Sequence, residues 1–407
     1  MKLVLILVDA MKSSYLNKEC TPFLFNLCKN GQYVKQVIPS PGFCERSEIF
    51  TGLDCYETAN FTALGYNPRN GAYANENFAL FLIKIVSFFS EKIARLILNK
   101  FRIFRGINMN SYRIPLKCLN KFVLTEDGDT KYIKYKTLFE QLDDSNMTYT
   151  MEFFTSLSSM KKLSNNKSLI DRLESEINKG TDFIPVYLGE LDAAGHKFGI
   201  DFDSIKPSLI NVDTVINNMY KIFTDKSYSL IVLGDHGMVP IIKNVDILDV
   251  LKKNGVKNSK NLLVFLDSTY ARFWSNDEHL LSEIGSILER EFKDDGIIVN
   301  KENFNMYGIP LDIKNSEDSY LYGDLVWCAN PGILISPDYF NDIKPSCSGM
   351  HGYLQTDMHH GTGVLISSEK VSSQSTDTIR LKDVCFEICS ILDIPQPNPS
   401  NWERQPI

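Results

Sequence analysis

The sequence LGELDAAGHKFG at residues 188–199 follows an apolar run at residues 183–188 that predicts a buried strand. Asp192 and His196 stand four residues apart, so a helix that follows the strand would place a carboxylate and an imidazole on one face. Such a pair at the carboxyl end of a strand suits a divalent metal that prefers oxygen and nitrogen ligands, such as zinc. The alternative is a polar loop with a capping Asp and a surface His, and this stretch alone does not decide between them.

Composition places the chain among globular proteins. Its 407 residues are 43% hydrophobic, which is enough for one main domain with insertions. The formal net charge of -7 argues against a nucleic-acid-binding protein. Nine cysteines without CxxC spacing indicate neither a zinc ribbon nor a disulfide framework, and their odd number favours reduced thiols in a cytoplasmic protein. The apolar run at residues 3–8 is too short for the core of a signal peptide and predicts a first strand.

Strands and helices alternate along the chain. The segments that predict strands include residues 3–8, 33–38, 147–152, 183–188, 228–233 and 363–366. Segments with helical periodicity separate them, at residues 21–30, 132–143, 167–178, 204–224 and 381–394. This alternation predicts an α/β fold with a doubly wound, mainly parallel sheet in a single domain over residues 1–407. Residues 240–345 resemble a smaller α+β insertion.

A second insertion, a helical cap at residues 72–130, contains an unusual stretch. Residues 78–105 are strongly apolar but carry six basic side chains, which are Lys84, Lys92, Arg95, Lys100, Arg102 and Arg105. A basic amphipathic helical pair of this kind suits peripheral contact with a membrane surface, or a grip on an acyl or isoprenoid tail. The alternative is a cap packed on the core, which the usual burial of apolar helices favours.

Acidic and histidine residues gather just after strands or in glycine-rich turns. They are Asp9, the pair Asp192 and His196, the pair Asp235 and His236, and His351. The chain has only six histidines, and three of them stand here beside carboxylates, whereas His279 lies apart on a predicted helix. A single histidine is usually structural, but several that converge with carboxylates at strand ends indicate a functional site.

At these residues the chain resembles the alkaline phosphatase superfamily, in particular its type I phosphodiesterase/nucleotide pyrophosphatase branch. The resemblance runs in order from Asp9 to about Ile366 through five short motifs. These are VDA at residues 8–10, FTGL at 50–53, DAAGHKFG at 192–199, GDHGM at 234–238, and MHGY at 350–353 followed by Asp357 and Met358. The resemblance implies the three-layer sandwich of that superfamily.

The resemblance also implies two divalent metal ions, usually zinc. Asp192, His196 and His351 would hold one of them. Asp9, Asp235 and His236 would hold the other. His359 is the second choice if His351 only shapes its turn.

The nucleophile of this family, a Ser, Thr or Cys, stands at the N-terminus of the helix that ends in TG. Here that position falls on Gly42, which has no side chain. Three replacements are open: Cys44 at the helix start, Ser40 or Ser47 through a shifted turn, or a metal-bound water. Cys44 is preferred, because a helix N-terminus and a metal both stabilise a thiolate. Arg46 is expected to pair with a phosphate oxygen, although it could be an ordinary surface charge.

We therefore expect a metal-dependent phosphoric ester hydrolase similar to phosphodiesterases and nucleotide pyrophosphatases. The expected substrate is a small phosphate ester, a nucleotide-sugar or a lipid-linked molecule. A phospho-headgroup transferase, a phosphomonoesterase or a sulfatase of the same superfamily is the first alternative. A non-catalytic binding protein that retains the metals but lacks the nucleophile is an alternative of another class.

Overall fold

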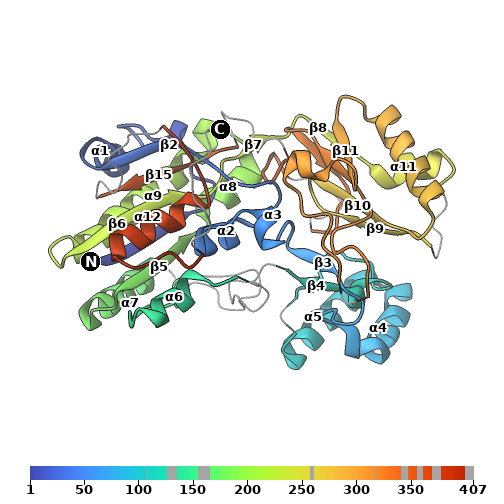
Figure 1. The fold of residues 1–407 in the computed structure, drawn as a ribbon, viewed down its shortest axis with the longest axis horizontal. Coiled ribbons are helices and arrows are strands. Elements are labelled where there is room, and N and C mark those ends of the chain that lie inside the picture. The colour runs from blue at the N-terminus through green and yellow to red at the C-terminus, as the bar shows by residue number, and fades with distance from the viewer. Residues whose placement is uncertain are drawn as a thin grey trace.

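A computed structural model shows the fold of the chain in two lobes (Figure 1). The structure describes residues 1–107, 109–125, 135–154, 166–256, 261–315, 317–340, 347–354, 361–368 and 377–398.

The larger lobe is built on a six-stranded sheet. In spatial order its strands are β16 (Thr378–Arg380), β2 (Gln32–Ile38), β15 (Gly363–Ser367), β6 (Tyr228–Gly234), β1 (Lys2–Val8) and β5 (Phe183–Leu188). β1 pairs in parallel with β5 and with β6, and β16 pairs in parallel with β2, whereas β15 is antiparallel to both of its neighbours. The sheet is therefore mixed and mainly parallel, which confirms the predicted fold class.

Helices cover both faces of this sheet. One face carries α1 (Pro22–Asn30), α7 (Asn166–Lys179), α8 (Glu190–Phe198) and α9 (Phe202–Phe223). The other face carries α2 (Glu45–Thr51), α6 (Leu138–Asp144) and α12 (Asp383–Leu392). The apolar side chains of β1 alternate between the two cores, because successive residues of a strand point to opposite faces. A strand buried on both faces needs the uninterrupted apolar sequence that predicted it.

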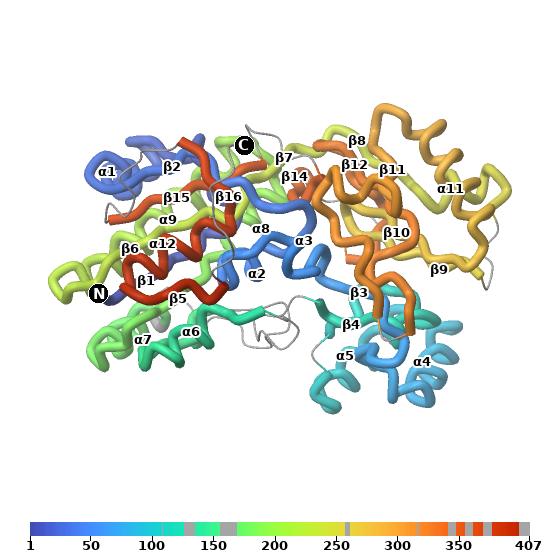
Figure 2. Tube along the Cα trace, viewed as in Figure 1, coloured from blue at the N-terminus to red at the C-terminus, as the bar shows by residue number. Residues whose placement is uncertain are grey.

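The smaller lobe contains a four-stranded antiparallel sheet. In spatial order its strands are β11 (Gly296–Asn300), β12 (Leu325–Ala329), β10 (Tyr270–Trp274) and β9 (Leu263–Leu266). It is completed by α10 (Ile247–Lys253), α11 (Glu278–Glu291), and the pair β8 (Lys243–Val245) and β13 (Ile333–Ile335). Figure 2 shows this lobe in yellow and orange at the opposite end of the molecule from α1 and α7.

Short elements join the lobes. They are α3 (Cys55–Thr58), β3 (Leu64–Tyr66), β4 (Phe122–Leu124), β7 (Val239–Pro240) and β14 (Gly349–Met350). β3 pairs with β4, and β7 pairs with β14. The chain also forms single-turn 3₁₀ helices at Ser13–Tyr15, Ala74–Glu76, Leu119–Lys121 and Phe304–Tyr307.

The predicted cap contains a helical hairpin, α4 (Asn77–Phe89) and α5 (Glu91–Arg105). The inner side of each helix enters a hydrophobic cluster through Leu80, Ile83, Ala94 and Leu98. In the described part of the chain, no helix is both long enough and apolar enough to cross a membrane.

Two predicted elements differ from the structure. Residues 147–152 form no strand, and Tyr149 makes only an isolated bridge with Phe183. The helix predicted from residue 132 begins instead at Leu138, where the Thr137 side chain caps its N-terminus. Residues 126–134 lie outside the described residues.

Candidate metal centre

The candidate ligands follow neighbouring strands of the large sheet. Asp9 comes directly after β1, and Asp192 lies in the first turn of α8, just beyond β5. Asp235 and His236 follow β6. Because β5, β1 and β6 are adjacent and parallel, their carboxyl ends meet at one edge, where ligands bind in open α/β sheets. His351 joins them from the segment after β14.

The first predicted set is assembled as one cluster. Asp192 and His196 lie one turn apart on α8, and Asp192 Oδ1 is 3.2 Å from His196 Nε2. The same oxygen is 3.6 Å from His351 Nε2. The ligand atoms of all three lie within 4.8 Å of one another, so one ion could contact them together.

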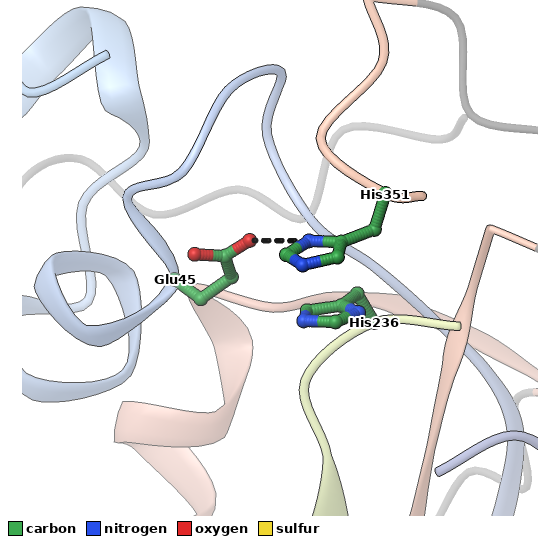
Figure 3. A group of neighbouring side chains, drawn as sticks. All are labelled: Glu45, His236 and His351. Carbon is green, nitrogen blue, oxygen red and sulfur yellow. Dashed lines mark ion pairs between the residues drawn. The ribbon is translucent and has the colours of Figure 1, made fainter. Parts of the chain in front are cut away.

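The second predicted set lies beside the first. His236 Nε2 is 3.0 Å from Asp9 Oδ1 and 3.8 Å from Asp235 Oδ1. The three ligand atoms that lie within 4.8 Å of one another here belong to Asp9, Asp192 and His236, and not to Asp235. Asp192 therefore lies between the two predicted sets. The His236 ring stacks on the His351 ring with centroids 3.7 Å apart, which makes the two clusters contiguous (Figure 3).

Several atoms in these clusters suit a cation. Asp9 Oδ1, Asp192 Oδ1 and His351 Nδ1 are buried, and the two carboxylate oxygens contact imidazole Nε2 atoms. Buried polar atoms need partners, so carboxylate oxygens and ring nitrogens that converge on one place are typical of a ligand set. The carboxylate and imidazole donors fit the divalent metal that the sequence predicts, and imidazole in particular suits zinc.

When no ion is bound, carboxylates and protonated imidazoles of these clusters neutralise one another's charge. Burial raises the pKa of Asp9, but the hydrogen bond and charge of His236 outweigh it and hold the pKa well below its ordinary value. Burial lowers the pKa of His196, but the hydrogen bond to Asp192 outweighs it and raises the pKa to about 10. Burial and the charges of His236 and His196 lower the pKa of His351 well below its ordinary value. A bound cation would replace the extra proton that His196 holds in its absence.

Further contacts orient the ligands. The Tyr187 hydroxyl donates to Asp9 Oδ2. His196 Nδ1 lies 2.9 Å from the Gly349 carbonyl oxygen, and His236 Nδ1 lies 2.7 Å from that of Gly237. With Nδ1 engaged by a carbonyl, each ring presents Nε2 to the cluster, as metal-binding histidines usually do.

A cavity of about 330 Å³ opens over the clusters. All six predicted ligands line it, together with Glu45 and Arg46 from the first turn of α2. Its apolar wall includes Phe43, Ala63, Tyr112, Phe340 and Met350. The Arg46 guanidinium carbon lies 5.2 Å from the ring centroids of both Phe154 and Tyr187, which keeps a positive charge on the cavity wall.

Comparison with known proteins gives the family. Residues 119–354 match the model of the type I phosphodiesterase / nucleotide pyrophosphatase family. The chain belongs to this family. The match takes in Asp192, His196, Asp235, His236 and His351, and Asp9 and α2 precede it.

The family's solved structures share the fold. Murine ectonucleotide pyrophosphatase/phosphodiesterase 5, as an inactive variant in complex with AMP, is 15% identical, with a TM-score of 0.69 over 99% of this chain and 97% of that chain. The human counterpart is 16% identical, with a TM-score of 0.68, and the match covers 99% of this chain and 97% of the human chain. GPI ethanolamine phosphate transferase 2 of Candida albicans is 31% identical over 135 residues, which are 32% of this chain and 14% of the transferase.

The position expected for the family's nucleophile is closed in this family member. Gly42 has φ +96°, and a Cβ built on it would lie 2.0 Å from the Phe61 carbonyl oxygen. Its N–H donates to the Gly352 carbonyl oxygen at 3.3 Å, and the Phe43 N–H donates to that of Phe61 at 2.8 Å. Position 42 therefore holds glycine because the chain packs tightly over it, and a larger residue cannot enter without moving Phe61.

The predicted substitutes do not reach the main cavity. Cys44 is buried, and its Sγ faces the Pro41 carbonyl oxygen at 3.7 Å and Glu48 Oε1 at 3.8 Å. Ser47 is buried and accepts a hydrogen bond of 2.8 Å from the Asn60 amide. The hydroxyl oxygen of Ser40 lies 3.3 Å from the backbone nitrogen of Cys55. Among these residues only Ser40 borders a smaller adjoining space. His359 lies outside the described residues.

Glu45 is the functional candidate that the sequence reasoning missed. It is the first residue of α2, and its Oε1 lies 3.9 Å from His351 Nδ1 (Figure 3). Its carboxylate forms a third group of ligand atoms with His236 and His351, and these atoms lie within 4.8 Å of one another. The clue in the sequence was an acidic residue between Cys44 and Arg46, at the start of the helix where the nucleophile was sought.

Proposed function

We propose that this family member is a metal-dependent phosphoric ester hydrolase that cleaves a phosphodiester or pyrophosphate bond. The observation that carries the proposal is the convergence of six carboxylate and imidazole residues from separate strand ends around one cavity. The family match and the AMP bound to the murine relative support a nucleotide-type phosphate ester as the first substrate class to test.

We propose that the ligands divide into the two sets that the resemblance implies. Asp192, His196 and His351 would hold one divalent ion. Asp9 and His236 would hold the other, with Asp235 beside them. When bound, such ions activate a nucleophile and neutralise charge that develops on the phosphoryl oxygens.

The chain's own groups supply binding and proton transfer. Arg46 lines the cavity and attracts a non-bridging phosphate oxygen. We take water as the nucleophile, because Gly42 offers no side chain and the Cys44 thiol faces away from the cavity. As the water oxygen bonds to phosphorus, its proton passes to the Glu45 carboxylate and the ester oxygen leaves with its bonding electrons. Tyr187 holds the Asp9 carboxylate in place through its hydroxyl.

Removal of one ligand tests the proposal. In Asp235→Ala and His236→Ala we expect loss of one metal equivalent and at least a ~100-fold fall in hydrolysis of bis(4-nitrophenyl) phosphate. Metal content is measured by inductively coupled plasma mass spectrometry. His279→Ala is the matched control, because this histidine lies on α11 away from the cavity. Unchanged metal content and rate in both ligand variants would contradict the proposal.

A second candidate is transfer of a phospho-headgroup to an acceptor. The similarity to part of a GPI ethanolamine phosphate transferase favours it. Product analysis with a glycan or lipid acceptor distinguishes transfer from hydrolysis. Stoichiometric metal without turnover of any ester or acceptor would favour the non-catalytic binding protein instead.

A further inference from the structure

The helical hairpin of α4 and α5 exposes large apolar side chains along its outer side. On α4 these are Phe78, Phe81, Leu82, Ile85, Phe88 and Phe89. On α5 they are Ile93, Leu96, Ile97, Ile103 and Phe104. Within each helix most recur at intervals of three and four residues, so they form a stripe along one side.

This stripe is not the side that packs on the protein. Leu80 and Ile83 of α4 are buried in the hydrophobic cluster beneath the hairpin, on the side of the helix opposite to the stripe. Phe88, Phe89 and Phe104 are 88%, 82% and 85% exposed. Single exposed apolar residues are common, but a contiguous group of this size marks a surface that contacts something else.

The charge around the stripe indicates the partner. Residues 77–105 carry six basic side chains and one acidic side chain, in a chain whose formal net charge is -7. Arg95 pairs with Glu91, and Arg105 pairs with Glu76. The described residues provide no ion-pair partner for the three lysines of the hairpin, which are Lys84, Lys92 and Lys100. A basic surface around exposed aromatic residues is complementary to anionic headgroups above acyl chains.

We propose that the outer side of α4 and α5 docks on the surface of an anionic lipid bilayer. The phenylalanines enter the boundary between headgroups and acyl chains, and the lysines contact lipid phosphates. A second copy of this chain is a poorer occupant, because it would bring two equally basic surfaces together. The proposal is independent of the proposed hydrolase activity.

The hairpin rests on a hydrophobic cluster that also borders the cavity. The cluster that seats the hairpin contains Ala63, and Tyr112 and Phe340 pack against it. These three residues also form part of the apolar wall of the cavity. The hairpin and the candidate metal centre thus share one hydrophobic support.

Vesicle co-sedimentation tests the proposal with the full chain. We expect it to sediment with vesicles of phosphatidylcholine and phosphatidylglycerol, less with pure phosphatidylcholine, and less as salt concentration rises. Phe88→Ser with Phe89→Ser should lower the partition coefficient about tenfold or more. Lys84→Glu, Lys92→Glu and Lys100→Glu together should lower it about a hundredfold.

Matched controls separate docking from general surface effects. Ile242→Ser with Met306→Ser removes apolar side chains that are 77% and 80% exposed elsewhere. Lys221→Glu, Lys252→Glu and Lys293→Glu together reverse the same number of charges outside the hairpin. Both control variants should bind like the unmodified chain, and all variants should keep its melting temperature.

Absence of binding to anionic vesicles would overturn the proposal. So would equal loss of binding in the control variants. A dimer that dissociates in the Phe88→Ser, Phe89→Ser variant, without any vesicle binding, would assign the surface to a second copy of the chain and overturn it as well.

Discussion

Gly42 shows how one residue limits the chemistry of this family member. Replacement by Ala would put a side chain at φ +96° and 2.0 Å from the Phe61 carbonyl oxygen. We expect Gly42→Ala to lower the free energy of unfolding by about 1–3 kcal/mol, measured by urea denaturation. Gly255→Ala is the control for strain alone, because Gly255 has φ +86° with nothing within 4 Å. Equal losses in the two variants would show that contact with Phe61 does not restrict position 42.

Cys44 and Glu45 are adjacent in sequence but play different parts in the structure. We expect Cys44→Ala to keep metal content and hydrolysis within about twofold, because its thiol faces Glu48 and not the cavity. Glu45→Gln should lower the hydrolysis rate by ~100-fold or more, because an amide cannot accept the water's proton. Rates and metal content are measured together. A large loss in Cys44→Ala with a normal Glu45→Gln would restore the thiol as nucleophile.

The sequence could predict some of the candidate site residues and not others for a physical reason. Asp9, Asp192 and Asp235 follow long apolar strands, and parallel neighbouring strands bring their ends together. The sequence offered no comparable guide to where the side chains at the start of α2 would point. Whether Cys44 or Glu45 faces the cavity depends on the backbone path from Gly42, which contacts with Phe61 and Gly352 determine.

At the scale of elements, the close approach of α8 and β14 holds the His196 ring. A Cβ on Gly349 would lie 2.6 Å from the Gly195 carbonyl oxygen and 2.8 Å from Met238, so Gly349→Ala must move β14. Its carbonyl oxygen, 2.9 Å from His196 Nδ1, would move with it. We expect zinc affinity to fall about tenfold or more, measured by competition with a chelator.

A second glycine gives the control for this variant. Gly285 lies within α11, and a Cβ there would meet only Leu325 at 3.9 Å. Gly285→Ala should leave zinc affinity unchanged and should stabilise the chain slightly, because Ala favours a helix more than Gly does. Unchanged affinity in Gly349→Ala would mean that the Gly349 carbonyl does not position His196.

Elements differed in how well the sequence predicted them. β1 and β6 are buried on both faces, and their uninterrupted apolar sequences leave little choice of structure. Residues 147–152 mix apolar and polar side chains and make only the bridge between Tyr149 and Phe183. Strand propensity depends on a partner edge along the full length of the segment, which a local sequence does not report.

At the scale of the whole molecule, the candidate metal centre connects parts that are distant in sequence. Its residues come from the ends of β1 and β6, from α2 and α8, and from the segment after β14. Each ion held there would stabilise the folded chain by about 4 kcal/mol at a thousandfold excess over its dissociation constant. For a chain of 407 residues this corresponds to a fall in melting temperature of about 5 °C for each ion that a chelator removes.

The identity of the ion that restores the melting temperature tests which donor atoms hold it. Zinc should restore the melting temperature of the chelated protein at lower concentration than magnesium, because imidazole ligands favour zinc over a cation that prefers oxygen. In His236→Ala the chelator should have a smaller effect, since one set has lost the nitrogen 3.0 Å from Asp9 Oδ1. An equal shift in this variant would place the stabilising metal elsewhere. Restoration by magnesium at the lower concentration would instead indicate that oxygen ligands dominate the centre.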